Sequence, residues 1–153
     1  MSSDVISKVP LFSGLGRNHI DAISKICKAE EHAAGEILFA EGSAGDKLFI
    51  IEKGEVRISQ KLQGMGEEAL AVLKPGSYFG EMALIDDSPR SADAISHTSV
   101  SLITIARDDL EELLFVNRDL AYAVLWNFCR TLSKRLRETN EKVKGFLAMA
   151  KWV

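Results

Sequence analysis

Residues 79–92 read Phe-Gly-Glu-Met-Ala-Leu-Ile-Asp-Asp-Ser-Pro-Arg-Ser-Ala, a loop between two groups of short apolar runs. Gly80 lets the backbone approach a ligand closely, and residues 81–85 can form one helical turn whose first N–H groups favour an anion. Arg90 follows a proline that fixes the backbone, so its planar guanidinium can be held over the same spot. The stretch therefore predicts a phosphate site. The alternative is a structural ion pair between Glu81 and Arg90 across the loop.

The apolar runs on both sides of this loop have a period of two and are punctuated by glycines. They lie at residues 36–39, 47–51, 55–59, 69–73, 92–95 and 100–105. Several short strands at regular spacing predict a closed antiparallel roll. Residues 64–69, Gly-Met-Gly-Glu-Glu-Ala, have the spacing of a dinucleotide-binding fingerprint, but no helix follows them. We expect a hairpin turn there.

Helical patterns flank the predicted roll. Residues 17–29 carry apolar side chains at every third position, and the period becomes helical again after residue 107. The longest predicted helix covers about residues 119–146 and has two lines of apolar positions at seven-residue intervals: Tyr122, Cys129, Leu136 and Val143, then Leu125, Leu132, Thr139 and Phe146. Such a seam is typical of a two-stranded coiled coil. The alternative is that this face packs on the roll.

The predicted fold class is α+β: a jelly-roll-like antiparallel β-roll with N-terminal helices and a long C-terminal dimerisation helix. The chain has 153 residues, the size of one domain. We therefore predict a single domain over 1–153, with the roll at about 30–106 and the C-terminal helices at about 107–146. Hydrophobic residues at 46% and charged residues at 27% exclude a disordered chain.

Composition and charge also limit the partners. No apolar run is long enough to span a membrane and the N-terminus does not resemble a signal peptide, so we expect a cytoplasmic protein without a membrane partner. Cys27 and Cys129 lie in stretches that both have helical patterns, and we expect free thiols. From residue 118 onward there are eight Lys and Arg against three Asp and Glu. These charges alternate with apolar residues at helical spacing, which favours the solvated face of a packed helix over a nucleic-acid site.

Motifs for catalysis are missing from the sequence. There is no G-x-S-x-G, Walker loop or H-E-x-x-H, and His19, His32 and His97 are too scattered to seat a catalytic metal. We therefore predict that the protein is not an enzyme.

The motif F-G-E-x-A-L, followed at this spacing by P-R-S-A, resembles the phosphate-binding cassette of the cyclic-nucleotide-binding domain family. The resemblance covers about residues 8–146, and residues 132–143 are similar to the dimer helix of the bacterial catabolite activators within that family. It implies that Glu81 accepts the ribose 2′-hydroxyl, that Gly80 offers close backbone contact, and that Arg90 with Ser91 holds the cyclic phosphate. The further cassette residues that we expect at the ligand are Phe79, Met82 and Ala83.

The resemblance also bears on the base. Thr139 occupies a seam position where an apolar residue would be expected, and it aligns, together with Asn140, with a pair that caps adenine from the two subunits of the dimer in the catabolite activators. An Asn amide offers a donor and an acceptor, which suits the adenine amino group and a ring nitrogen. The alternative is a solvated Asn140. We expect cAMP as a regulatory ligand, with cGMP bound less tightly, and no other cofactor.

Together these features predict a stand-alone cyclic-nucleotide sensor that signals to an unknown effector protein through a shift of the long helix. The homodimer contacts that we expect are Leu125, Leu132, Leu136 and Val143. Only seven residues follow Phe146, too few for a winged DNA-binding domain. Two alternatives stay open: a ligand-free interaction module, which the intact Glu81 and Arg90 argue against, and a minimal nucleic-acid binder, which lacks a reading element.

Overall fold

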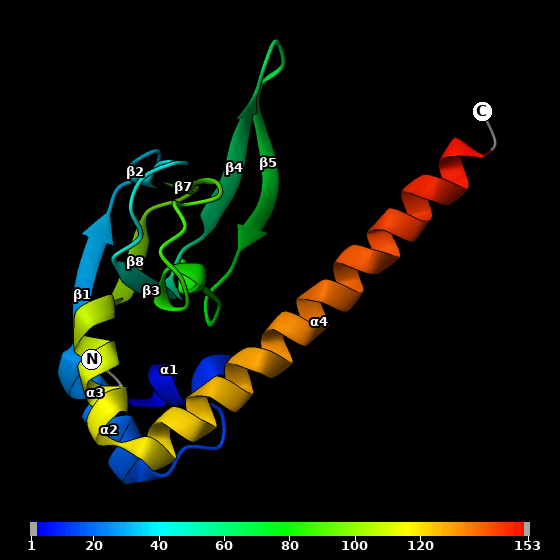
Figure 1. The fold of residues 1–153 in the computed structure, drawn as a ribbon. Helices are drawn as coiled ribbons and strands as arrows, with labels where there is room; N and C mark the ends of the chain where they lie inside the picture. The colour runs from blue at the N-terminus through cyan, green and yellow to red at the C-terminus, as the bar shows by residue number, and fades with distance from the viewer. Residues whose placement is uncertain (1–2, 152–153) are drawn as a thin grey trace.

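Two antiparallel four-stranded sheets form a roll, and helices gather at one end of it (Figure 1). The computed structural model describes residues 3–151, except for the side chains of Ala83 and Leu84. The first sheet has the order β1 (Cys27–His32), β8 (Val100–Ala106), β3 (Lys47–Lys53) and β6 (Tyr78–Phe79). The second has the order β2 (Ile37–Phe39), β7 (Asp93–Ser96), β4 (Val56–Leu62) and β5 (Gly66–Leu73). The predicted α+β roll is confirmed.

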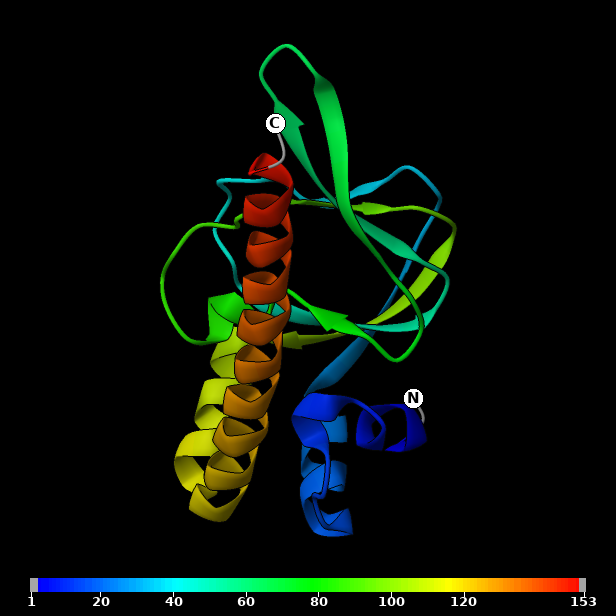
Figure 2. The same ribbon diagram turned by 90° about the vertical axis from the view of Figure 1, so that its right-hand side faces the viewer.

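The helices precede and follow the roll in the chain. They are α1 (Ser3–Ser7), the 3₁₀ turn η1 (Pro10–Phe12), α2 (Arg17–Ile26), α3 (Arg107–Val116) and α4 (Arg118–Ala150). The first three and α3 surround the beginning of α4, which then runs past the roll toward the side where the β4–β5 hairpin projects (Figures 1 and 2). Asn117 separates α3 from α4. No helix within residues 3–151 combines the length and the apolar character needed to cross a membrane.

Strand β3 explains how two cores share one sheet. Its run Leu48-Phe49-Ile50-Ile51 is buried throughout because both faces of the first sheet are covered. Leu48 and Ile50 join a cluster with residues of the helices, which we call the helix-side core. Phe49 and Ile51 join a second cluster inside the roll. Phe49 of the second cluster lies against Arg90 of the loop at residues 80–92, so this loop packs on an aromatic part of the core.

Local patterns misplaced one boundary and missed two strands. The helix predicted to reach residue 29 ends at Ile26, and Cys27 begins β1 instead of lying in a helix. The reason is tertiary: Cys27 pairs with Ile105 of β8, and this ladder continues to His32. Strand β6 has only two residues and depends on its pairing with β3.

Both cysteines are free, as predicted, and burial raises the pKa of Cys27 to about 11.

Two other predictions of local structure are confirmed. Gly64 and Gly66 have positive φ angles of 79° and 73° in the tight connection between β4 and β5, so the glycine-rich stretch is a hairpin turn. The long helix exists, although it extends over Arg118–Ala150.

The two parts of α4 have different surroundings. Its first part packs through Leu120, Val124 and Phe128 into the helix-side core. There the buried Asn127 donates hydrogen bonds from Nδ2 to the carbonyl oxygens of Leu11 (3.1 Å) and Ser13 (2.8 Å), which fastens α4 to the N-terminal segment. Every residue from 133 to 151 is exposed.

Most apolar side chains of the predicted seam on α4 do not pack on the roll of their own chain. Its exposed apolar members are Tyr122, Leu125, Leu136, Val143 and Phe146. Leu132 differs from them, because it is half-buried against the helix-side core. The homodimer contacts stay a prediction.

Candidate functional site

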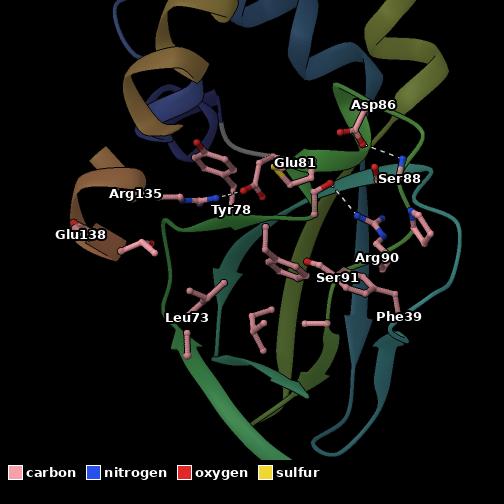
Figure 3. A pocket seen from close by; sticks show the side chains of 18 of the residues that line it. Phe39, Leu73, Tyr78, Glu81, Asp86, Ser88, Arg90, Ser91, Arg135 and Glu138 are labelled. Carbon is pink, nitrogen blue, oxygen red and sulfur yellow. Dashed lines mark hydrogen bonds and ion pairs between the residues drawn. The ribbon is translucent and has the colours of Figure 1, made fainter. Parts of the chain in front are cut away.

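A cavity of about 580 Å³ lies between the open side of the roll and α4 (Figure 3). Its walls come from β2, β4, β5 and β6, from the loop after β6, and from four residues of α4. This size is typical of small-molecule sites. Seven of the predicted site residues line it: Phe79, Gly80, Glu81, Met82, Arg90, Ser91 and Thr139. Asn140 is exposed and is not part of the lining. The side chain of Ala83 lies outside the described residues.

Gly80 begins the loop in a conformation that requires glycine. Its φ angle is +78°, and a Cβ atom there would lie 2.7 Å from Nη1 of Arg90 and 3.3 Å from the carbonyl oxygen of Lys47. The chain then forms the short 3₁₀ turn η2 (Glu81–Leu84), where the sequence predicts one helical turn. The loop can therefore pass close to Arg90 only because residue 80 has no side chain.

Arg90 is held inside the roll by several groups. Nη1 donates to the carbonyl oxygen of Gly80 and Nη2 to that of Lys47, both at 2.9 Å. The guanidinium carbon lies 4.2 Å from the ring centre of Phe39, within cation–π range. The backbone N–H of Arg90 also donates to the carbonyl oxygen of Ser43 at 2.8 Å. The orientation of the guanidinium is therefore set by the roll itself.

The electrostatics of Arg90 are unusual for an arginine. It is only 7% exposed, and it forms no ion pair with a carboxylate of the described residues. Burial lowers its pKa, an effect that the nearby Asp46 opposes, yet an arginine stays protonated in proteins. Its Nε is buried without a hydrogen-bond partner among the described residues. A buried cation that lines a cavity and has no carboxylate partner among the described residues favours an anionic ligand.

Glu81 pairs with Arg135, a residue outside the predicted site. Its carboxylate is buried and accepts a hydrogen bond from Nη1 of Arg135 on α4 (Figure 3). The alternative of a Glu81–Arg90 ion pair is therefore wrong, because Arg90 donates to backbone carbonyls instead. The guanidinium carbon of Arg135 lies 5.5 Å from the ring centre of Tyr78.

The α4 wall of the cavity consists of Arg135, Glu138, Thr139 and Lys142. These positions lie on one face of a helix, because residues three, four and seven apart are neighbours there. Once Thr139 is expected to face a ligand, the same spacing points to Arg135 and Lys142, and Glu138 lies three and four residues from these two. No such local signal exists for Phe39, Leu73 or Tyr78, which reach the cavity from separate strands.

The arrangement suits an anion that also carries a hydroxyl group and a flat apolar part. Arg90 supplies a positive charge, Glu81 accepts hydrogen bonds only, and the strands β2, β4 and β5 contribute apolar side chains to the wall: Phe39, Ile58, Ala71 and Leu73. Among residues 3–151, no three His, Cys, Asp or Glu side chains are grouped so that they could hold a metal ion.

The geometry agrees with what the chain is similar to. A family model described as the cyclic nucleotide-binding domain matches residues 29–117. The chain is 29% identical over 144 residues to the CRP-like cAMP-activated global transcriptional regulator of Mycobacterium tuberculosis, covering 94% of this chain and 62% of that protein. It is 34% identical over 131 residues to the cyclic AMP receptor protein of Thermus thermophilus, covering 86% of this chain and 59% of that protein.

A solved structure gives the same picture. The crystal structure of the Thermus thermophilus catabolite activator protein superposes with a TM-score of 0.78 at 32% identity, covering 88% of this chain and 62% of that chain. The present chain thus spans about three fifths of the length of these relatives. The family match ends at residue 117, at the junction of α3 and α4, so the α4 wall of the cavity lies beyond it.

Proposed function

The chain belongs to the cyclic nucleotide-binding domain family, and on that premise we propose that its cavity binds a cyclic mononucleotide, with cAMP preferred, and that the protein is a regulatory rather than a catalytic component. One observation carries the proposal: Arg90 is a buried, oriented guanidinium at the cavity with an unpartnered Nε. A cyclic phosphodiester has one negative charge and acceptor oxygens, so it matches this group in charge and in hydrogen-bonding capacity.

Each part of the ligand has a counterpart in the cavity. In the proposal, Arg90 and Ser91 hold the phosphate, and Gly80 allows the close approach of the backbone. Glu81 accepts the ribose 2′-hydroxyl, because a carboxylate accepts and a hydroxyl donates. Phe79 and Met82 also line the cavity. The apolar side chains of β4 and β5 provide a surface for the flat base.

Calorimetric titration with cAMP, cGMP and the linear 5′-AMP tests this proposal. Arg90→Ala should cost on the order of 2–5 kcal/mol of binding, because the phosphate would lose its charged partner. The matched control is Arg57→Ala, which removes an arginine of β4 that pairs with Glu67 and does not line the cavity. Equal affinity in the wild type and in Arg90→Ala, or no heat with either cyclic nucleotide, would contradict the proposal.

Discrimination between bases is proposed to come from α4. Thr139 lines the cavity, whereas Asn140 does not line the cavity of its own chain. Asn140 would therefore act on the cavity of a second copy. We expect cAMP to bind about tenfold more tightly than cGMP, which corresponds to about 1.4 kcal/mol. A preference for cGMP, or full discrimination in a variant with both Thr139→Ala and Asn140→Ala, would show that α4 does not read the base.

A homodimer along α4 is also part of the proposal. The exposed apolar side chains of the seam have the seven-residue spacing that a parallel pair of helices buries. Light scattering should give twice the chain mass of 16.8 kDa for the wild type. Leu136→Asp should dissociate the dimer because it places two carboxylates in the seam, whereas Lys134→Asp, outside the seam, should not. A monomeric wild type would contradict the seam.

Signalling would follow from a ligand that contacts the loop after β6 and α4 at the same time. Such a ligand binds one arrangement of α4 better than another, and that difference in affinity moves the equilibrium. An effector protein would then recognise the favoured arrangement. Hydrogen exchange of residues 133–150 with and without cAMP tests this step, because unchanged exchange at saturating ligand would mean that α4 does not respond.

A further inference from the structure

Arg135 connects the exposed part of α4 to the roll. It lies beyond residue 132, where α4 has no buried residue among those described. Of the described residues in this part of α4, Arg135 alone forms a side-chain hydrogen bond to another element, and its partner is the buried Glu81. The two residues are 54 positions apart in the chain. Because the side chain of Arg135 is long and half-exposed, its contact with Glu81 needs a further group that holds the guanidinium in place.

Tyr78 provides a rigid support for that side chain. It lies on β6, two residues before Gly80, and is only 4% exposed. It packs in the helix-side core. The guanidinium carbon of Arg135 lies over the face of its ring, 5.5 Å from the ring centre. Figure 3 shows Tyr78 and Glu81 beside the end of the Arg135 side chain. A fixed ring attracts a guanidinium and restricts the rotamers that a solvated arginine would otherwise sample.

The hydroxyl group of Tyr78 is not what matters in this contact. It is buried and has no hydrogen-bond partner among the described residues. The ring face alone can therefore act on Arg135, and phenylalanine would provide the same face. This distinction makes a matched pair of variants available.

We propose that Tyr78 is a positioning residue whose ring face holds the Arg135 guanidinium against Glu81 and thereby fixes the carboxylate that the cavity presents to a ligand. One carboxylate oxygen of Glu81, Oε1, accepts from Arg135, and no described contact engages the other. The free oxygen faces a defined direction only while the first is held. The placement of Arg135 is independent of any ligand, whereas its consequence for affinity rests on the proposed cyclic-nucleotide site.

The first test uses the ligand-free protein. A guanidinium above a ring shifts the NMR signals of the Arg135 Hδ and Hε protons upfield through the ring current. The shift should be present in the wild type and in Tyr78→Phe and absent in Tyr78→Leu, with thermal melting to confirm that each variant is folded. An absent shift in the wild type, or an unchanged shift in Tyr78→Leu, overturns the proposal. If the leucine variant does not fold, Tyr78→Met replaces it in the same comparison.

The second test is a double-mutant cycle read by cAMP affinity. Tyr78→Leu should weaken binding about fivefold, and Tyr78→Phe should change it by less than about twofold. In the Arg135→Gln background, Tyr78→Leu should have no further effect, because the group it positions is gone. The same loss in both backgrounds would mean that Tyr78 acts only through core packing and would overturn the proposal. A wild type that binds no cyclic nucleotide but keeps the ring-current shift would refute the proposed function and leave the positioning of Arg135 intact.

Discussion

Arg90 and Arg135 approach the same turn from opposite walls of the cavity. Arg90 donates to the carbonyl oxygen of Gly80, and Arg135 donates to the carboxylate of the next residue, Glu81. Each guanidinium also lies over an aromatic ring, at 4.2 Å for Arg90 and 5.5 Å for Arg135. They differ in their surroundings: Arg90 is 7% exposed inside the roll, whereas the side chain of Arg135 is 46% exposed on α4.

These surroundings show which wall of the cavity is preorganised. The two carbonyl groups that orient Arg90 belong to β3 and to the loop after β6, which pack on the core inside the roll. This guanidinium is in place before a ligand arrives, so binding does not have to order it. Arg135 depends on one carboxylate, one ring and the position of α4. The roll wall should therefore determine most of the affinity for a ligand, and the α4 wall should change its arrangement when the ligand binds.

The largest effect is expected for Gly80→Ala. The new Cβ atom would lie 2.7 Å from Nη1 of Arg90 in a backbone conformation that disfavours alanine, so it would displace the preorganised arginine. We expect a loss of about 3 kcal/mol in the free energy of unfolding, together with loss of cyclic-nucleotide binding. Urea denaturation and calorimetry measure the two effects.

Gly64→Ala is the control for this substitution. Gly64 has nearly the same φ angle, +79°, but nothing lies within 4 Å of a Cβ atom built there. The Gly64→Ala variant should lose only about 1 kcal/mol in the free energy of unfolding, from the backbone conformation, and should keep its affinity for cyclic nucleotides. Equal effects of the two variants would mean that contact with Arg90 contributes nothing.

The next effect concerns the α4 wall. Arg135→Gln leaves the buried carboxylate of Glu81 without its cation, and we expect a loss of about 1–2 kcal/mol in the free energy of unfolding. This value is below that of a fully buried pair, because Arg135 is half-exposed. Adding Glu81→Gln should recover most of the loss, since no unpaired charge remains. A double variant less stable than Arg135→Gln alone would show that the pair does not act as a unit.

A smaller effect compares the two aromatic supports. Phe39→Leu removes the ring beneath Arg90 but leaves its two bonds to carbonyl oxygens, so affinity for cAMP should fall by only about twofold. Tyr78→Leu should cost more, although its ring lies farther from its arginine, because Arg135 has fewer other contacts. The reverse order in calorimetry would contradict the view that the roll alone preorganises Arg90.

The smallest effect is the pH dependence of stability that arises from the ion pairs of His32 with Glu30 and Glu36. Glu30 accepts from Lys47 Nζ at 2.6 Å and pairs with His32, which also contacts Glu36. Burial lowers the pKa of His32, but hydrogen bonds to the two carboxylates outweigh it and raise the pKa overall. Because the folded pKa is the higher one, the stabilisation is complete below about pH 6.5 and is lost as the pH rises through the folded value.

The change in stability between about pH 6 and pH 8 should be under about 0.5 kcal/mol and absent in His32→Gln, since these groups are partly exposed. Affinity for cAMP should stay constant over the same range, because Arg90 remains protonated. Urea denaturation and calorimetry at both pH values measure the two quantities. Stability that increases over this range in the wild type but not in His32→Gln would contradict the pairing.

Much of the fold could be predicted because its signals are local. The period of two predicts most of the strands, the glycines predict the β4–β5 turn, and the seven-residue repeat predicts α4. Strand β1 was missed because its start was assigned to the preceding helix and its last three residues, Glu30-Glu31-His32, include no apolar side chain, and β6 because two residues form no pattern. Both strands exist only through pairing with β8 and β3.

Residue types at short spacing were enough to predict the roll, the long helix and the loop with Gly80, Glu81 and Arg90. The pairing of Glu81 with Arg135 rather than Arg90, and the position of Tyr78 under that contact, depend on the folded chain. They could not be predicted because the residues are far apart in the sequence. Periodicity describes which face of an element is apolar, whereas the approach of residues 54 positions apart depends on how α4 is fastened through Asn127 and where the helix-side core ends.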